Sequence, residues 1–162
     1  MQIVFEAVKL KEGNSSLSLD DLKLVPSPCP VLGSCDFSSD TCGYSLSAQD
    51  PLLWLVGNGK THNPNITLGP HEDAMDSIGM YAYMDFTMDG LENNDIGRII
   101  SPPVPATDSS CFSFWVNIFG KQPGQIVVQK VGGHTKSKLI LFYSEGSDQW
   151  ELWEHPCYPN GC

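Results

Sequence analysis

Two cysteine-containing stretches decide the fold of this chain: Cys35-Asp36-Phe37 with Cys42-Gly43-Tyr44, and Cys111-Phe112-Ser113-Phe114-Trp115, which follows Ser101-Pro102. Residues 111–119 alternate with a period of two, which is typical of a β-strand with one buried face. An even number of cysteines in such a chain suggests disulfides. Together the two stretches indicate a disulfide-stapled β module rather than an active site.

The period-two pattern recurs along the chain, with glycine and proline between the runs. Residues 2–8 and the leucines of 17–24, on either side of the turn cluster 13–16, predict a hairpin with one buried face. No stretch has a sustained helical period. We therefore expect an all-β fold, an antiparallel two-sheet jelly-roll-like β-sandwich stapled by disulfides. The other runs that read as strands are residues 52–56, 79–85, 98–100, 111–119, 125–131 and 139–143.

The charge balance is strongly acidic. The 162 residues include 19 Asp and Glu but only 9 Lys and Arg, so the formal net charge is −10. Phosphate groups are bound mainly through Lys and Arg, which argues against nucleic acid and anionic membrane surfaces as partners. No apolar run reaches the roughly 18 residues of a membrane span, so we expect no direct membrane insertion in this segment.

The cysteines and two glycosylation sequons favour an extracellular setting. Six cysteines stand at 29, 35, 42, 111, 157 and 162, without the C-x-x-C pairs of a structural zinc site. The sequons Asn14-Ser15-Ser16 and Asn65-Ile66-Thr67 make Asn14 and Asn65 glycan acceptors. Glu6 and Lys9 interrupt any signal-peptide core at the start. We expect a piece of a longer secreted protein or of the ectodomain of a membrane protein.

The sequence contains no recognisable catalytic motif. His71-Glu72 lacks the second histidine of H-E-x-x-H, and no G-x-S-x-G elbow or phosphate-binding glycine loop occurs. The four histidines lie in polar, loop-like contexts, where surface positions are the ordinary interpretation. We therefore expect a protein that is not an enzyme.

An acidic stretch admits two interpretations. Oxygen-rich loops suit Ca²⁺, which takes six to eight oxygen ligands, but acidic clusters are more often a solvated face. An EF-hand is excluded because the twelfth position counted from Asp85 is Ile96 instead of a bidentate Glu. The stretch contains Glu72, Asp73, Asp76, Asp85, Asp89, Glu92 and Asp95.

Aromatic residues of the second cysteine stretch divide between two faces of one strand. Phe112 and Phe114 share a face, and Trp115 points the other way with Ser113. Only one face can line the core, so Trp115 is either covered by a loop or exposed for a partner. The sequence leaves both alternatives open.

These motifs resemble, in order and spacing, the MAM domain, the extracellular module named for meprin, A5 antigen and receptor tyrosine phosphatase mu. The two cysteine stretches are similar to the family's C-D-F-E…C-x-W and C-L-S-F-W. Between and after them, the similar segments are Trp54, 69–73 before the family's D-H-T, 79–83 with its G-x-Y, 100–102 with its L-x-S-P, and 146–150 with its G-x-x-x-W. Ser38 stands where the family usually has Glu, and Ala74-Met75 replaces the His-Thr of D-H-T.

The order of the segments departs from the family. Residues 5–7, 17–22 and 28–29 resemble its final hairpin, F-E-A…I-A-L-D-D-I…P-x-C, yet they come first. The resemblance implies that 1–29 is the C-terminal hairpin of a preceding or permuted module, 30–34 a linker, 35–156 the MAM domain, and 157–162 the start of a tail or an incomplete remainder. A chain cut from a tandem array is the origin we favour. A self-contained unit is the alternative, and it predicts that residues 2–24 share a sandwich with Phe112 and Phe114.

The resemblance also implies disulfides and a cation site. It pairs Cys35 with Cys42, whose close spacing suits a tight loop. In a self-contained unit it pairs Cys29 with Cys111. Pro159-Asn160-Gly161 is a plausible turn between Cys157 and Cys162, which we expect to be joined. Asp36 and Asp73 are the residues that we expect to meet at a cation, with Ca²⁺ as the cofactor.

The resemblance implies a non-catalytic extracellular adhesion or recognition module of a larger cell-surface or matrix protein. It would act by protein-protein contacts, homophilic or between neighbouring repeats, and tandem copies would add avidity. The alternative is an accessory or oligomerisation domain of a secreted or membrane-bound protease. That alternative predicts a catalytic domain elsewhere in the parent protein.

Overall fold

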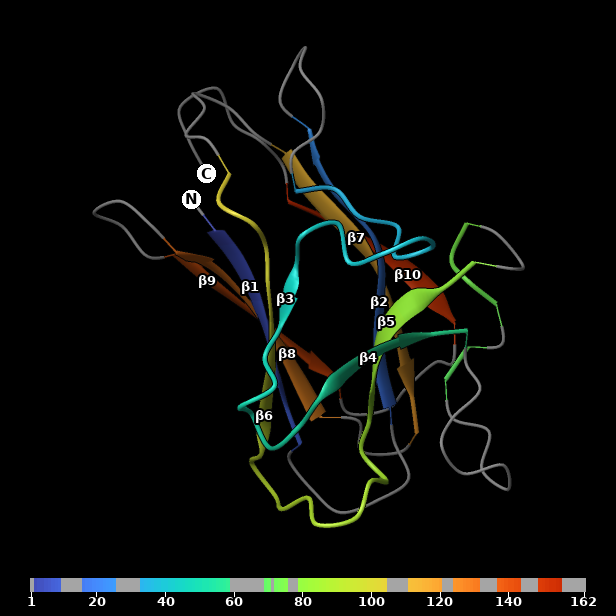
Figure 1. The fold of residues 1–162 in the computed structure, drawn as a ribbon, viewed down its shortest axis with the longest axis vertical. Coiled ribbons are helices and arrows are strands. Elements are labelled where there is room, and N and C mark those ends of the chain that lie inside the picture. The colour runs from blue at the N-terminus through green and yellow to red at the C-terminus, as the bar shows by residue number, and fades with distance from the viewer. Residues whose placement is uncertain are drawn as a thin grey trace.

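Two β-sheets pack face to face in the computed structural model of the chain (Figure 1). The structure describes residues 2–9, 16–25, 33–58, 69–70, 72–75, 79–104, 111–120, 124–131, 137–143 and 149–155, and these residues contain strands but no helix. The first sheet has the order β3 (Ser45–Leu46), β6 (Ile96–Ile100), β1 (Gln2–Val8), β8 (Gly124–Val131) and β9 (Ser137–Tyr143). The second sheet has the order β10 (Trp150–His155), β7 (Cys111–Phe119), β2 (Ser16–Val25), β5 (Tyr81–Asp85) and β4 (Trp54–Gly57).

Every pairing between neighbouring strands is antiparallel. The expected all-β two-sheet sandwich is thus confirmed. The strand expected at 111–119 has the same bounds as β7, and that at 2–8 the same bounds as β1. Strands β3 and β10 were not expected from the sequence.

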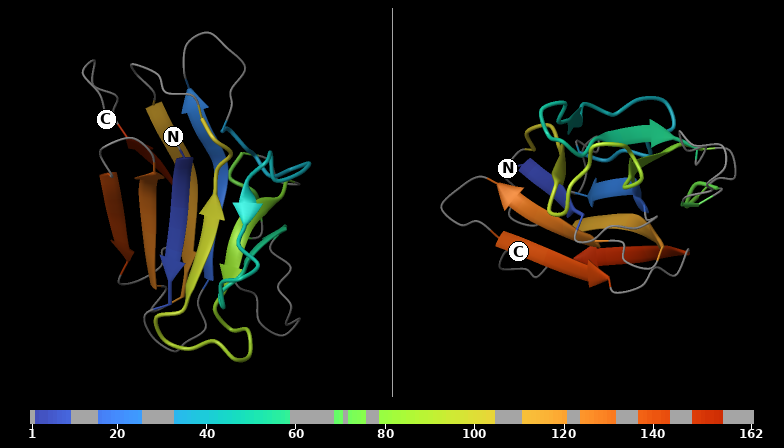
Figure 2. Two further views of the ribbon diagram at one scale, coloured as in Figure 1. Left: turned by 60° about the vertical axis from the view of Figure 1, so that its left-hand side comes forward. Right: turned by 90° about the horizontal axis from the view of Figure 1, so that it is seen from below.

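The expected hairpin of residues 2–24 is wrong in one respect. Its two strands form, but β1 lies in the first sheet and β2 in the second, so they do not pair with each other. Strand β1 pairs with β6 and β8, whereas β2 pairs with β5 and β7. Figure 2 shows β1, in dark blue, between β8 and β6. Both strands are therefore central, and the chain crosses from one sheet to the other between them. We call residues 2–25 the N-terminal strand pair.

The N-terminal strand pair supplies part of the core. Strand β1 alternates half-buried and buried residues, and the ring of Phe5 lies 5.6 Å from that of Phe112 and 5.1 Å from that of Phe114. Phe5 and Phe114 are fully buried. Burying such a ring stabilises a fold by about 1.5–3 kcal/mol relative to leaving it exposed. Strands β1 and β2 therefore share a sandwich with Phe112 and Phe114, as the self-contained alternative predicts, whereas the Cys29–Cys111 bond of that alternative lies outside what the structure describes and stays a prediction.

Strand β2 is interrupted by a bulge. Its register against β7 shifts between Asp20 and Lys23, and Asp21 has a positive φ of 45°. A bulge re-aims the strand and frees its backbone for other contacts. Here Leu22 forms a two-way backbone pair with Cys35, with both N–H to O distances at 2.7 Å.

The first disulfide lies beside this bulge. Cys35 is bonded to Cys42, with Cα atoms 5.6 Å apart, which confirms that pair. The Phe37 ring within the loop is fully buried and lies 6.1 Å from the ring of Tyr44. The Tyr44 hydroxyl donates to the Gly33 carbonyl at 2.6 Å. The covalent loop is thereby anchored to the core and to β2.

Candidate functional site

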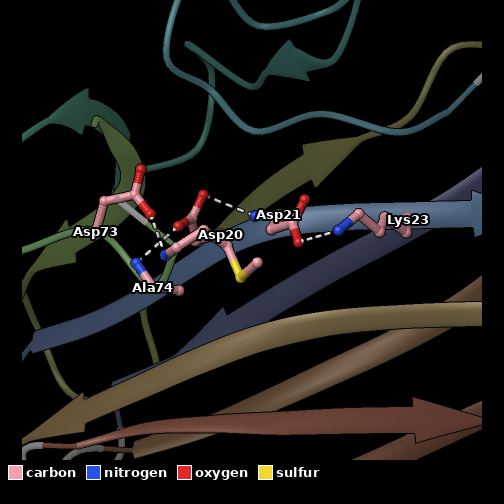
Figure 3. Close-up of polar contacts among 6 residues, drawn as sticks. Asp20, Asp21, Lys23, Asp73 and Ala74 are labelled. Atoms are coloured by element: carbon pink, nitrogen blue, oxygen red, sulfur yellow. Dashed lines mark hydrogen bonds and ion pairs between the residues drawn. The ribbon is translucent and has the colours of Figure 1, made fainter. Parts of the chain in front are cut away.

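A pair of buried carboxyl groups joins β2 to the segment before β5. Asp20 lies at the bulge of β2 with 1% of its surface exposed, and Asp73 lies in the loop segment 72–75 with 9% exposed. The two side chains share a hydrogen bond. Figure 3 shows Asp73 and Ala74 facing Asp20 on the strand.

Backbone donors complete the pair. Asp20 accepts from the N–H of Ala74 at 3.0 Å and from that of Asp21 at 2.7 Å. Asp73 accepts from the N–H of Met75 at 2.6 Å. Each carboxyl group is thus held by the backbone, and the loop is tied to the bulge.

The pair holds a proton at neutral pH. The pKa of Asp20 is raised from 3.8 to about 8, mainly because burial penalises the charged carboxylate. The hydrogen bond to Asp73 and the negative charge of that side chain contribute to this rise, whereas the N–H groups of Ala74 and Asp21 oppose it. Two carboxylates in one buried site cannot both ionise cheaply. The protonated Asp20 therefore donates to Asp73.

Gly79 makes room for Asp73. A Cβ atom built on Gly79 would lie 1.7 Å from Oδ2 of Asp73 and 2.6 Å from its Cγ. These distances are far below van der Waals contact. The glycine is thus required by the close approach of the carboxyl group.

The loop segment is also anchored at the far side of the second sheet. The Tyr81 hydroxyl donates to the Pro70 carbonyl, and Nε1 of Trp150 donates to the Glu72 carbonyl at 2.9 Å. The Tyr81 and Trp150 rings lie edge to face with centroids 5.4 Å apart. Segments 69–70 and 72–75 therefore lie against the outer face of this sheet, from β2 to β10.

A patch of buried polar side chains lies beside these segments. Both polar atoms of the Asn117 side chain, and the hydroxyls of Ser16 and Ser18, are buried and have no hydrogen-bond partner within the part of the chain that the structure describes. Asn117 and Ser18 are register neighbours on β7 and β2. Gly69 approaches closely, because a Cβ built on it would lie 3.1 Å from Oγ of Ser16. Unpaired buried polar groups destabilise a fold unless a ligand or water satisfies them.

Trp115 lies on this outer face, in register with Asp20 on one side and Leu152 on the other. The Trp115 side chain is half-buried, so it is neither fully covered by a loop nor fully exposed for a partner. Phe112 and Phe114, on the opposite face of the strand, line the core. Leu152 is 48% exposed and Met75 64% exposed. We call Met75, Trp115 and Leu152 the outer apolar rim.

The residues predicted to hold a cation occupy different environments. Asp36 is exposed, and its Oδ1 accepts from the N–H of Ser38 at 3.0 Å. Asp73 is buried against Asp20. Among the described residues no three or more Asp, Glu, His or Cys side chains form a group that could hold a metal. The Ca²⁺ site at Asp36 and Asp73 stays a prediction.

The alternative interpretation, a solvated acidic face, holds only in part. Glu72, Asp89 and Glu92 are exposed. Asp73 and Asp85 are not, since Asp85 is 2% exposed and its Oδ1 accepts from the N–H of Thr87 at 2.8 Å. The solvated-face interpretation is wrong for these two residues because both are buried. Hydrogen bonds from backbone N–H groups compensate the cost of burying their carboxyl groups.

Several predicted residues lie outside the description. Cys29, Cys157, Cys162, Asn14 and Asn65 lie outside the described residues, as does Asp76. Cys111 is the first residue of β7, but its side chain is not described. Their pairings and modifications stay predictions.

Sequence reasoning missed Asp20 and Asn117 as members of a site. Ser16, Ser18 and Asp20 alternate with buried leucines, a pattern normally typical of a solvent-facing strand surface. One signal was available in the sequence. Asn117 is a polar residue between two apolar residues, in a strand whose pattern indicates a central position in its sheet. A further finding is that no helix long and apolar enough to cross a membrane occurs in the described part of the chain.

The sequence of the chain matches one family model and several known proteins. The family model described as "MAM domain, meprin/A5/mu" matches residues 35–157. Thyroid hormone-induced protein B of Xenopus laevis is 25% identical over 118 residues, which cover 72% of this chain and 17% of that protein. MAM domain-containing protein 2 of Mus musculus is 26% identical over 160 residues, which cover 94% of this chain and 22% of that protein. The chain thus spans about a fifth of the length of these curated relatives. No solved structure matches it.

Proposed function

The chain belongs to the MAM domain family, and from this membership we propose that it is an adhesion or recognition module of a larger extracellular protein, acting by protein-protein contacts in tandem repeats. MAM domains are non-catalytic modules of extracellular regions. The observation that carries the proposal is the family match over 35–157, which contains eight of the ten described strands, β3 to β10. The short share of each relative that the chain covers supports a module within a longer protein.

The outer apolar rim is the contact surface that supports recognition. Its Met75 and Leu152 expose apolar area, and Trp115 lies in register with Leu152. Trp and Met are enriched in protein interfaces, and buried Trp side chains dominate their energetics. The rim lies beside the Asp20–Asp73 pair, which fixes the loop that carries Met75. A weak contact of this kind gains strength when several modules act together, because tethering raises the effective concentration.

A density-dependent attachment assay tests the proposal. The chain is secreted from animal cells and coated on a surface at increasing density, and attachment of cells is counted. We expect attachment to rise steeply with coating density, and the double variant Met75→Glu and Leu152→Glu to lose most of it. The matched control is Glu154→Gln, an exposed residue of the same strand as Leu152. Attachment that ignores density, or that the double variant retains in full, would contradict the proposal.

A further inference from the structure

The N-terminal strand pair fills one gap in each sheet. Without β1, strands β6 and β8 have no neighbour on their facing edges, and without β2 the same holds for β5 and β7. All four of these neighbours come from the part of the chain that the family model matches, whereas the strand pair lies before it. The matched part thus forms an acceptor slot that runs through both sheets.

The slot is closed by extensive contacts. Strand β1 has five register pairs with β6 and seven with β8. Strand β2 pairs with β7 over almost its whole length and with β5 over four residues. The inward residues of the strand pair are deeply buried, and they are Ile3, Phe5, Ala7, Leu17, Leu19 and Leu22. An empty slot would expose four strand edges and this core, so a sandwich with the slot empty is strongly disfavoured.

The strand pair is joined to the rest of the chain by a proline-rich segment. Prolines stand at 26, 28 and 30 in the sequence between β2 and the first disulfide loop. Proline lacks an N–H donor and favours an extended backbone. The proline content of residues 26–32 is typical of a linker, and a fully extended chain of seven residues spans roughly 20 Å. We expect a linker of this composition to allow the strand pair to occupy the slot of a second copy as well as the slot of its own chain.

We propose that the slot accepts the N-terminal strand pair of a second copy, so that neighbouring modules are joined by exchange of these strands. The inference rests on the proposed function, because tandem repeats bring the copies together. The comparison with mouse MAM domain-containing protein 2 supports it. Only 6% of the 162 residues, about ten, lie outside that match, so at least part of the strand pair is matched together with the module in a much longer protein. Exchange of identical elements replaces every contact by an equivalent one.

Disulfide trapping between two copies tests the exchange. Val4 of β1 and Gln129 of β8 are register partners, and both are half-exposed. One copy carries Val4→Cys and an isotope-labelled second copy carries Gln129→Cys. The copies are incubated together at high concentration in a glutathione buffer, and the linked peptides are identified by mass spectrometry. Neither variant can form this bond within one chain, so a bond between labelled and unlabelled peptides reports exchange.

Two controls make the outcomes decisive. Glu154→Cys replaces Gln129→Cys in the collision control, because Glu154 is exposed on the other sheet. The single-chain double variant Val4→Cys and Gln129→Cys reports the register itself. We expect the bond between copies to exceed the collision control at least tenfold. The pair Gln2→Cys and Val131→Cys, also register partners, repeats the test if the first variants fail to fold.

A bond between copies at the level of the collision control, with the single-chain bond formed, would overturn the exchange. Failure of both bonds in folded protein would overturn the slot itself. Neither outcome depends on cell attachment, so the exchange and the proposed function can fail separately.

Discussion

Asp20 on β2 and Asp73 in the loop segment before β5 share one hydrogen bond although 53 positions separate them in the sequence. Asp20 also accepts from the N–H of Ala74, so the contact joins a strand bulge to a loop backbone. The bulge in turn holds the first disulfide loop through Leu22 and Cys35. One protonated carboxyl group thus links the loop that carries Met75 to the bulge of β2 that pairs with the first disulfide loop.

The raised pKa of Asp20 predicts how stability depends on pH. The folded pKa is about 8 and the ordinary value is 3.8, so between these values the folded state binds more protons than the unfolded state. The stabilising contribution of the protonated Asp20 is then fully present below about pH 4, and it is lost as the pH rises toward 8. We expect Asp20→Asn, which keeps the shape without the ionisation, to flatten this decline. Urea unfolding at pH 4.5, 6.0 and 7.5 measures it.

The Asp20→Asn comparison isolates the pair from the other carboxylates, which shape the background equally in both proteins. Parallel pH profiles of wild type and variant would contradict the shared proton. If the free energy of unfolding rose with pH more steeply in the wild type than in the variant, the pKa of Asp20 would be lowered by folding instead of raised.

Gly79→Ala tests the fit of the loop around Asp73. The new Cβ would lie 1.7 Å from Oδ2 of Asp73, so the loop must shift, and overpacking of this kind costs about 1–3 kcal/mol. We expect the urea concentration at the midpoint of unfolding to fall, with an unchanged dependence of the free energy of unfolding on urea concentration. In the Asp73→Ala background the clash is gone, so Gly79→Ala should cost clearly less there. Equal costs in the two backgrounds would show that Asp73 does not occupy this space.

The strands and the first disulfide could be predicted because their signals are local. Alternation identified residues 2–8 and 111–119 with the bounds that β1 and β7 have. The short spacing of Cys35 and Cys42 and the family motif indicated their bond. Each of these features depends on residues close together in the chain.

Strand partners and the carboxyl pair could not be predicted because they depend on distant residues. Alternation shows that a strand has a buried face but not which sheet holds it, so the turn cluster at 13–16 suggested a hairpin where the chain crosses between sheets. The outward position of Asp20 reads as exposed, but Asp20 is buried, and the loop that contacts it at Ala74 lies 54 positions away in the sequence. Strand β10 lies at a sheet edge, where Glu151 and Glu154 are exposed and weaken the alternation.

Phe5→Ala tests whether the N-terminal strand pair belongs to this sandwich. The fully buried Phe5 ring contacts the rings of Phe112 and Phe114, and deleting such a ring costs about 3–5 kcal/mol. Val4→Ala, at the neighbouring half-buried position, is the control and should cost no more than about 1 kcal/mol. Denaturant unfolding monitored by tryptophan fluorescence compares them. A near-neutral Phe5→Ala would place the strand pair outside the core.

Asn117→Leu tests the buried polar patch at Asn117, Ser16 and Ser18. Neither polar atom of the buried Asn117 side chain has a partner among the described residues, and leaving such a group unsatisfied costs about 1–3 kcal/mol. Leucine has a similar size and removes both atoms, so we expect the variant to unfold at an equal or higher urea concentration. Asn117→Asp, of nearly the same shape, adds a buried charge beside Ser18 and should lower the midpoint strongly. If Asn117→Leu instead destabilised the protein by more than about 1 kcal/mol, the Asn117 side chain would be engaged by a bound water or ion, and the patch would be a satisfied polar site.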